Sequence, residues 1–341
     1  MKKLRVLLVV DKDLVPPEDY KGKDYTEEEW RTEYDVQVTL RELGHEVKTL
    51  GVVRNLEVID EVFREWKPDI AFNLLQDVYT VIPYDYNMVA YFELLGLAYT
   101  GCNPMGLLIS RDKAMTKKLL RYHRIHVPRF TVCRRDRKVK RSRRLEFPLI
   151  VKSLTEDASL GISGQSIVYD DESLAERVDF VHDRLESHAI VEQFIAGREF
   201  YVGVMGNTRL EVFPPWELIV EHKAQDAELL ATRKVKWDRA YQKKHGVTTR
   251  AAKDLPEPLA SRLGQISRRI YRVLNLSGYA RLDFRLAEDG TAYLLEANAN
   301  PDVAYGEDFA ESAEHAGLPY GKVVQRILNL GLRWKEEHAI I

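Results

Sequence analysis

The sequence predicts an open α/β sheet over roughly residues 1–110, followed by α+β units that are rich in strand hairpins. Short apolar runs typical of buried strands alternate with helical patterns in the first part of the chain, as a mostly parallel sheet requires. Beyond residue 110 the pattern changes to paired strands with a few helices. The chain has 341 residues, and at about 100–200 residues per domain this length fits two or three domains.

Composition and charge exclude several classes of protein. The chain is 45% hydrophobic and 30% charged, with 51 Lys and Arg, 53 Asp and Glu, and a net charge of −2. Neither long disorder nor bulk electrostatic binding to nucleic acid or membrane is therefore expected. The two cysteines, Cys102 and Cys133, form no CxxC pattern, which favours a reducing compartment. Because no apolar run approaches the roughly 20 residues of a membrane helix, we expect a cytoplasmic protein.

The N-terminal elements follow from the positions of apolar residues. Residues 4–10 form an apolar run that only Arg5 interrupts, typical of a strand that is covered on both faces. Residues 25–43 have helical spacing at Trp30, Tyr34 and Val38, and Gly44 ends that helix. The same criteria predict strands at residues 45–50, 69–74 and 97–100 and helices at residues 56–66 and 85–95.

A helix over residues 110–122, with Ser110 as its N-cap, opens the second part of the chain. Strands are expected at residues 147–153, 165–169, 189–195 and 199–205, helices at residues 174–185, 257–274 and 319–334, and a hairpin at residues 278–298. We expect residues 1–110 to form an N-terminal α/β domain. Residues 111–193 would then form a small central subdomain and residues 194–341 a C-terminal subdomain.

A basic run lies within the central part. Residues 134–144 contain eight Lys or Arg and one acid, Asp136, which gives a local charge of +7. Charge runs usually form solvated surface segments, and that is the default interpretation. The alternative is a docking site for an acidic partner, such as a carrier protein, a nucleic acid or an acidic peptide, although no RNA-binding signature accompanies the run.

The hairpin at residues 278–298 carries the most specific signal. Asp289-Gly290 stands between two alternating apolar runs, which is the strongest short-range hairpin signal. A two-residue turn there pairs Asp283 with Glu296 and Arg281 with Asn298. Because side chains alternate between the faces of a strand, these four project together. Leu282, Phe284, Leu295 and Ala297 face the other way.

Two directly opposed carboxylates repel each other unless a cation lies between them. Magnesium takes oxygen ligands and binds through one or two carboxylates together with substrate phosphates, so Asp283, Glu296 and Asn298 are candidate ligands. Arg281 is then suited to stabilise charge on a transferred phosphoryl or acyl group. The alternative is a solvated face on which Arg281 compensates the acids. A three-residue loop would shift the register and separate the pair.

Four stretches, read in order, resemble the ATP-grasp superfamily and within it the D-alanine–D-alanine ligase branch. They are residues 92–101 with 110–113, residues 147–152, residues 191–199, and Arg281-Leu-Asp283 with residues 295–301. The resemblance covers about residues 90–330. It implies an ATP-grasp fold with a Rossmann-like pre-ATP-grasp domain in residues 1–110, a small lid in residues 111–193 and a metal-binding hairpin in residues 194–341.

The resemblance also implies roles for individual residues. Lys113 and Lys152 match the two lysines that hold ATP phosphates, and Lys236 matches a further phosphate ligand, with Arg233 and Lys234 as alternatives. Residues 155–164, which include Ser159 and Gly161, resemble the glycine-rich loop that closes over phosphates. The adenine-binding linker corresponds to Glu192, Gln193, Phe194 and Ile195, and the ribose-binding residue to Glu199.

The implied reaction is ATP-dependent amide formation. ATP phosphorylates a carboxylate to an acyl phosphate, and an amine then displaces phosphate. Arg281, Lys152 and Lys236 would supply catalysis by charge neutralisation together with magnesium, two ions being expected and manganese able to substitute. The partners would be small-molecule or peptide acids and amines. A homodimer that pairs through the N-terminal domain is expected by analogy with the branch.

The substrate half departs from the branch. Residues 11–22 are glycine-poor where the branch has a Gly-Gly loop with a Ser and a Glu, and residues 73–79 lack its His-Gly stretch. Tyr305-Gly-Glu307-Asp308 stands where the branch places a Ser-Leu pair on a substrate carboxylate. We therefore expect substrates other than two D-alanines, with Glu307 or Asp308 facing a cationic acceptor. Tyr20, Tyr79 and Tyr84 either line that pocket or pack in the core.

Three other functions stay open. The first is a genuine D-alanine–D-alanine ligase, but the three substrate motifs of that enzyme are missing from this sequence. A catalytically weak nucleotide-binding scaffold would have no need of the opposed acids Asp283 and Glu296. The third is an ATP-grasp enzyme that phosphorylates its acid without forming an amide.

Overall fold

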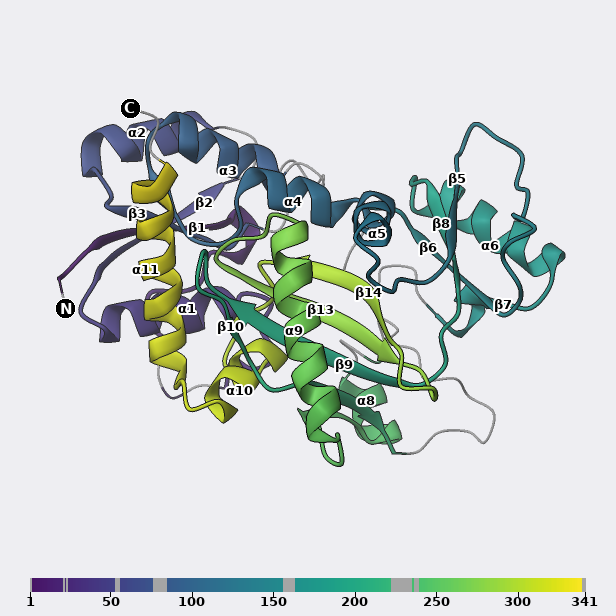
Figure 1. Cartoon of the computed structure of the whole chain (residues 1–341). Coiled ribbons are helices and arrows are strands. Elements are labelled where there is room, and N and C mark those ends of the chain that lie inside the picture. The colour runs from purple at the N-terminus through teal and green to yellow at the C-terminus, as the bar shows by residue number, and fades with distance from the viewer. Residues whose placement is uncertain are drawn as a thin grey trace.

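The computed structural model describes residues 2–20, 22, 24–52, 56–75, 85–155, 163–221, 235 and 239–338. Three sheets follow one another across the molecule. The N-terminal sheet lies at the left of Figure 1, a six-stranded sheet in the middle and a four-stranded sheet at the right. This mixture of α/β and α+β architecture confirms the predicted fold class. Among the helices that the structure describes, none is long and apolar enough to cross a membrane.

The N-terminal sheet is parallel throughout, with the strand order β2-β1-β3-β4. Its strands are β1 (Arg5–Asp11), β2 (Glu46–Val52), β3 (Ile70–Asn73) and β4 (Ala98–Tyr99), and its helices are α1 (Arg31–Glu42), α2 (Glu57–Trp66) and α3 (Asp85–Leu94). The five inner residues of β1 are buried, as the apolar run predicts. A short 3-10 helix, η1 (Lys12–Leu14), follows β1.

Helix α1 begins later than the sequence pattern predicts, at Arg31 instead of residue 25. The Asp24 carboxylate accepts hydrogen bonds from the backbone N–H and the hydroxyl of Thr26, at 3.0 and 2.7 Å. Such a local side-chain turn competes with helical hydrogen bonding. Tyr25 also donates its hydroxyl to Asp35 at 2.8 Å, so the apolar residues before Arg31 pack onto the helix without extending it.

The first and last elements of the chain share one core. Helix α11 (Tyr320–His338) packs against α1, β3 and β4, and α10 (Asp308–His315) precedes it. Val6 and Leu8 of β1 lie in the same buried cluster as Val323 and Ile327 of α11. Strand β1 and helix α11 therefore lie on the same side of the molecule (Figure 1). The division into domains at residues 110 and 193 stays a prediction.

The central sheet is antiparallel, in the order β12-β11-β9-β13-β14 with β10 paired to β9. Its strands are β9 (Arg198–Met205), β10 (Glu211–Val212), β11 (Trp216–Val220), β12 (Val247–Ala251), β13 (Tyr279–Leu286) and β14 (Ala292–Ala299), and its helices are α8 (Arg239–His245) and α9 (Glu257–Val273). Leu282, Phe284 and Ala297 pack into the core that α9 shares with this sheet. Arg281 and Asp283 therefore project from the opposite face of the sheet.

The small sheet has the order β5-β8-β6-β7. It consists of β5 (Phe130–Cys133), β6 (Leu149–Ser153), β7 (Ile167–Val168) and β8 (Ala189–Gln193), with α6 (Asp171–Arg184) and the 3-10 helix η3 (Gly164–Ser166). The basic run follows β5 as a largely exposed segment. Arg141 pairs with Asp171 at 2.7 Å and Arg135 donates to the Glu186 carbonyl at 2.9 Å. These contacts favour the solvated-segment interpretation.

Two helices, α4 (Pro104–Arg111) and α5 (Lys113–Tyr122), run between the N-terminal and small sheets (Figure 1). The prediction that Ser110 caps the second helix is wrong, because Ser110 lies inside α4. Asp112 caps α5 instead, accepting from the N–H groups of Ala114 and Met115, both at 2.8 Å. The two helices meet at this residue, so one continuous helical pattern conceals the break.

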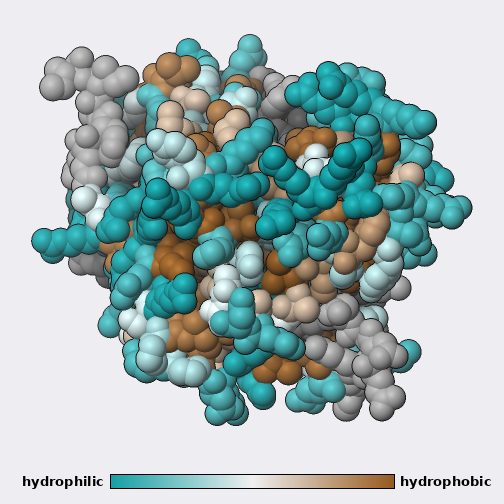
Figure 2. Space-filling model, turned by 45° about the vertical axis from the view of Figure 1, so that its right-hand side comes forward, coloured by the Kyte–Doolittle hydropathy of each residue, from teal (hydrophilic) through white to brown (hydrophobic). Residues whose placement is uncertain are grey.

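The space-filling view shows one face of the molecule, on which apolar surface lies between hydrophilic side chains (Figure 2). Exposed apolar side chains of the described chain include Met105 and Leu108 on α4 and Met115 on α5. Singly exposed apolar residues of this kind are normal on a protein surface.

Candidate active site

The β13–β14 hairpin has the predicted pairing but not the predicted turn. Asp283 lies opposite Glu296, and Arg281 lies opposite Asn298. The Ala287 N–H donates to the Thr291 carbonyl at 3.0 Å, and Gly290 adopts a φ of 77°, so the loop has three residues and a left-handed glycine.

An irregularity between Asp283 and Phe284 restores the register that this longer loop shifts. Phe284 consequently pairs with Leu294, and the two side chains share the core. The prediction that Leu295 faces the core with Phe284 is therefore wrong. A bulge of this kind re-aims side chains, and here it keeps the two carboxylates opposite each other.

Each opposed carboxylate has its own cation. Arg281 donates from Nε and Nη2 to the two oxygens of Asp283, at 2.8 and 3.1 Å. Lys113 Nζ lies 2.9 Å from Glu296 Oε1, so a lysine at the start of α5 reaches the hairpin. Burial opposes the charge on Arg281, but Asp283 and Asp308 raise the pKa of the guanidinium. The guanidinium also lies over the ring of Tyr201, 4.6 Å from its centroid.

The hairpin residues offer a suitable donor set for magnesium. Asp283 and Glu296 supply carboxylate oxygens, and Asn298 supplies an amide oxygen. The Asn298 Nδ2 atom is buried without a hydrogen-bond partner in the described chain, so no acceptor fixes the orientation of this amide. Within the described residues no group of three His, Cys, Asp or Glu could hold a metal. A metal here would rest on two carboxylates and an amide oxygen, with substrate oxygens or water completing the shell, as magnesium prefers.

A buried triad of charges joins the small sheet to the hairpin. Glu192 at the end of β8 is fully buried, with Lys117 Nζ 3.2 Å from Oε1 and Lys152 Nζ 3.4 Å from Oε2. Burial opposes ionisation of Glu192, but the two ammonium groups outweigh it and lower the pKa of that carboxyl. Lys117 also donates to the Leu295 carbonyl at 2.6 Å. Glu192 therefore holds the predicted phosphate ligand Lys152 in place through its side chain.

The predicted adenine linker is partly engaged within the protein. The Gln193 N–H donates to the Arg129 carbonyl at 2.8 Å, and the Phe194 N–H to the Pro148 carbonyl at 3.1 Å. Ile195, the last residue of the predicted linker, is buried. Glu199, the predicted ribose ligand, is also buried, with Arg285 Nη2 2.5 Å from Oε2 and the Tyr201 hydroxyl 3.1 Å from Oε1. The roles of these residues stay predictions.

Several predicted residues lie outside the described part of the chain. They are Tyr79, Tyr84, Ser159, Gly161, Arg233, Lys234 and Lys236. Tyr20 is described, and it packs edge-on against Trp30 and Tyr34, with ring centroids 5.0 and 6.4 Å apart. These contacts favour the core-packing interpretation for Tyr20.

The acidic pair after β14 lies beside the hairpin. Glu307 Oε1 is 3.3 Å from Arg31 Nη1, and Asp308 Oδ2 is 3.6 Å from Arg281 Nη1. Thr249 donates its hydroxyl to Asp308 at 2.5 Å. Burial, followed by the charges of Asp302 and Asp308, raises the pKa of Glu307 to about 7. Asp308 therefore belongs to the same charge cluster as the predicted catalytic arginine.

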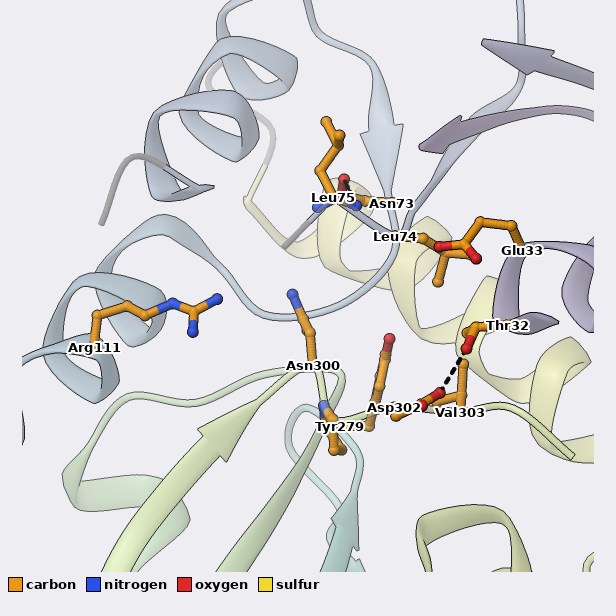
Figure 3. A pocket seen from close by; sticks show the side chains of 11 residues that line it. Thr32, Glu33, Asn73, Leu74, Leu75, Arg111, Tyr279, Asn300, Asp302 and Val303 are labelled. Carbon is orange, nitrogen blue, oxygen red and sulfur yellow. Dashed lines mark hydrogen bonds between the residues drawn. The ribbon is translucent and has the colours of Figure 1, made fainter. Parts of the chain in front are cut away.

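A small pocket adjoins this cluster, between the start of α1, the end of β3 and the segment after β14 (Figure 3). Its lining includes Thr32, Glu33, Asn73, Tyr279, Asn300 and Asp302. Thr32 donates to Asp302 at 2.9 Å across the junction between α1 and that segment. Residues that are far apart in the sequence, such as Thr32 and Asp302, thus line the same pocket.

Comparison with known proteins assigns the chain to a family. Residues 119–329 match the family model described as the D-ala D-ala ligase C-terminus. The chain belongs to the D-alanine–D-alanine ligase family. An uncharacterized protein of Sinorhizobium fredii, y4sG, is 30% identical over 87% of this chain and 86% of its own length. The D-alanine–D-alanine ligase of Syntrophotalea carbinolica is 30% identical over 87% of this chain and 89% of its own length.

Solved structures support the fold. The D-alanine–D-alanine ligase of Bacillus anthracis, solved in complex with ATP, superposes with a TM-score of 0.77 at 22% identity and covers 98% of this chain and 100% of its own. The resemblance to the ATP-grasp superfamily and its D-alanine–D-alanine ligase branch is thereby confirmed. Family and fold together identify an ATP-dependent, ADP-forming ligase.

Sequence reasoning missed several charged residues of this site, among them Lys117, Arg31 and Glu33. Lys117 stands four residues after Lys113, on the same face of a helix, and that spacing is a usable signal. Arg31 and Glu33 reach the site only because α1 packs beside the segment after β14. No local pattern reveals a contact of that kind.

Proposed function

We propose that the chain is an ATP- and magnesium-dependent carboxylate–amine ligase that forms an amide through an acyl phosphate, with substrates other than two D-alanines. The observation that carries this proposal is the hairpin face on which Arg281, Asp283, Glu296 and Asn298 project together, next to the acids Glu307 and Asp308. The first four residues suit phosphoryl transfer. The two acids suit a cationic amine and would repel a substrate carboxylate.

The mechanism divides the work among described residues. Lys152, held by Glu192, and Lys113 would bind the phosphates of ATP. Asp283, Glu296 and Asn298 would hold magnesium, which when bound neutralises phosphate charge and is replaceable by manganese, since both favour oxygen ligands. Arg281 lies where it would stabilise the oxygens of the transferred group.

Two displacements complete the reaction. An oxygen of the acid attacks the γ-phosphorus as the bond to the β-phosphate oxygen breaks, which releases ADP. The lone pair of a neutral amine then attacks the acyl carbon as the bond to the phosphate oxygen breaks, and the attacking nitrogen loses one proton to solvent.

The test is ADP release with ATP and magnesium against pooled acids, with hydroxylamine present to convert any acyl phosphate into a hydroxamate for mass spectrometry. We expect a hydroxamate, and we expect Asp283→Asn to abolish it. Asp289→Asn is the matched control, because it makes the same change in the exposed turn of the same hairpin. A hydroxamate that survives Asp283→Asn would contradict the proposed role of the hairpin, and ATP binding without any adduct would favour the scaffold alternative.

A genuine D-alanine–D-alanine ligase is the second candidate, favoured by the names of the relatives. D-Alanine alone, in the same assay without hydroxylamine, separates the two. Formation of the dipeptide with one ADP per product would show that the substrates are two D-alanines, contrary to our proposal.

A further inference from the structure

A basic surface segment carries charges that neither the fold nor the proposed active site uses. Residues 134–144 connect β5 to β6 on the small sheet, at the right of Figure 1, and contain eight Lys or Arg against one acid, Asp136. The whole chain has a net charge of −2 and this segment has +7, so the rest of the chain carries −9. Like charges that are held close together repel each other, so this concentration needs an explanation.

The segment follows a defined path, although most of it is exposed. Val139 packs against the core of the small sheet, and Leu145 is buried in that core. The Arg135 guanidinium donates to the Glu186 carbonyl at 2.9 Å, and the Arg135 N–H donates to His188 Nδ1 at 3.2 Å. The chain is therefore held onto the small sheet at several points between β5 and β6.

Two turns present the remaining cations on this surface. The Arg137 N–H donates to the Arg134 carbonyl at 3.1 Å, and the Leu145 N–H donates to the Ser142 carbonyl at 2.9 Å. Bonds of this kind close β-turns, and the second turn has arginine at both of its central positions. Six cationic side chains of the segment are exposed and form no ion pair with an acid of the described chain: Arg134, Arg137, Lys138, Lys140, Arg143 and Arg144.

The segment already binds one carboxylate from within the chain. Arg141 donates from Nε and Nη2 to the two oxygens of Asp171, at 2.7 and 3.5 Å. Such a fork recognises a carboxylate by its shape as well as its charge. Six of the eight cations in the segment are arginine, so the unpaired guanidinium groups offer the same geometry to carboxylates from outside the chain.

The surroundings favour an acidic polypeptide over a nucleic acid or a membrane. Residues 134–144 contain no Phe, Tyr, Trp or His on which bases could stack. A polyanion longer than the segment would also meet the net charge of −9 on the rest of the chain, whereas a short acidic stretch would meet only the basic turns. The apolar residues Val139 and Leu145 pack onto the protein core, so they do not provide the apolar face with which amphipathic segments enter lipid.

We propose that residues 134–144 form a docking site for an acidic segment of another protein. Arg135 and Arg141 hold the site on the small sheet, and the six unpaired cations bind Asp and Glu side chains of the partner. The site contains no residue to which a role with nucleotide, metal or substrate is given. This inference therefore goes beyond the proposed ligase function and does not depend on it.

The test measures the binding of labelled peptides to the full chain by fluorescence anisotropy. The probe is a fluorescein-labelled peptide of alternating Glu and Ser, and the matched peptide has Gln in place of every Glu. The Glu peptide should bind at least about ten-fold more tightly than the Gln peptide, because several ion pairs act together. Raising the NaCl concentration from about 0.05 M to about 0.5 M should remove most of this preference, since salt screens exposed charges.

Charge-reversal variants assign the binding to the segment. Arg143→Glu combined with Arg144→Glu should weaken binding of the Glu peptide about ten-fold or more, and Lys138→Glu combined with Lys140→Glu tests the same prediction in the middle of the segment. Arg262→Glu combined with Arg272→Glu makes the same change of charge on the exposed face of α9. This control should alter the affinity by less than about two-fold. All of these side chains are exposed, so each variant should keep the stability and ATP affinity of the wild type.

Three results would overturn the proposal. They are equal affinity for the Glu and Gln peptides, an equal loss of affinity in the α9 control, and tighter binding of a labelled DNA duplex or of phosphatidylserine vesicles than of the Glu peptide at the same salt concentration. The last result would assign the surface to a nucleic acid or to a membrane. None of them affects the hydroxamate assay, so failure of the docking site and failure of the ligase proposal are distinguishable.

Discussion

Removing the carboxylate of Glu192 should destabilise the protein strongly. Glu192→Gln leaves Lys117 and Lys152 without the anion that lies 3.2 and 3.4 Å from their ammonium groups. Lys117 is 1% exposed, so water does not replace the lost partner. Breaking a buried ion pair by removing one member costs about 3–5 kcal/mol, which is a large part of the roughly 5–15 kcal/mol that stabilises a typical domain.

The loss should depend on pH in a defined direction. Burial already lowers the pKa of Lys117 below its ordinary value of 10.5, and without Glu192 that pKa should fall further. Between the folded pKa and 10.5 the unfolded chain binds a proton that the folded variant does not, so the stability of the variant rises with pH. The deficit relative to the wild type should therefore shrink as the pH approaches 10.5.

Urea unfolding at several pH values measures this effect, with Glu176→Gln as the control because Glu176 is exposed on α6 of the same part of the fold. ATP affinity should fall in the same variant, since Lys152 loses the group that positions it. A loss of stability under about 1 kcal/mol, as found for exposed pairs, would refute the reasoning. So would a deficit that grows with pH.

Three further predictions concern single residues. Because the pKa of Glu33 is raised from 4.5 to about 7, ionisation of Glu33 above pH 7 should lower the free energy of unfolding by up to about 3 kcal/mol. Urea unfolding of the wild type should show this loss disappearing as the pH falls from 7 to 4.5. In Glu33→Gln the loss should be absent at every pH. Gly290→Ala should lower the free energy of unfolding by about 1 kcal/mol, because Gly290 has a φ of 77°, whereas Gly264→Ala inside α9 should raise it. Glu307→Gln should raise the KM for a cationic acceptor about ten-fold and leave kcat nearly unchanged, because the lost charge acts on binding; an equal fall in both kcat and kcat/KM would contradict this.

The hairpin illustrates how far sequence reasoning extends. The pairing of Asp283 with Glu296 could be predicted because a hairpin is local and its turn residues are distinctive. The predicted turn is one residue shorter than the observed loop, and the irregularity after Asp283 restores the predicted register. Bulges depend on what a strand packs against. At this bulge Lys117 donates to the Leu295 carbonyl, and a pattern of alternating residues does not reveal such a contact.

The ends of helices were less predictable than their existence. Asp112 separates α4 from α5 by accepting two backbone N–H groups, yet the apolar pattern runs through it. The charged contacts of the site were the least predictable part. Lys117 of helix α5 meets Glu192 of the small sheet, and Arg31 of α1 meets Glu307 from the opposite end of the chain. Such pairs are set by how the sheets pack and leave no local trace in the sequence.

The distribution of charge explains why one site could serve two unlike substrates. Lys113, Lys117 and Lys152 lie around Glu192 and Glu296, where cations outnumber acids, whereas acids predominate around Asp302, beside Glu33 and Glu307. The net charge of the whole chain is only −2, so this polarity is local. Under the proposed function, the first group would attract the polyanionic nucleotide and the second would attract an amine. Under the same proposal, an acceptor with a free carboxylate would meet anions where it would need a cation, so an amino acid would be excluded from the second position.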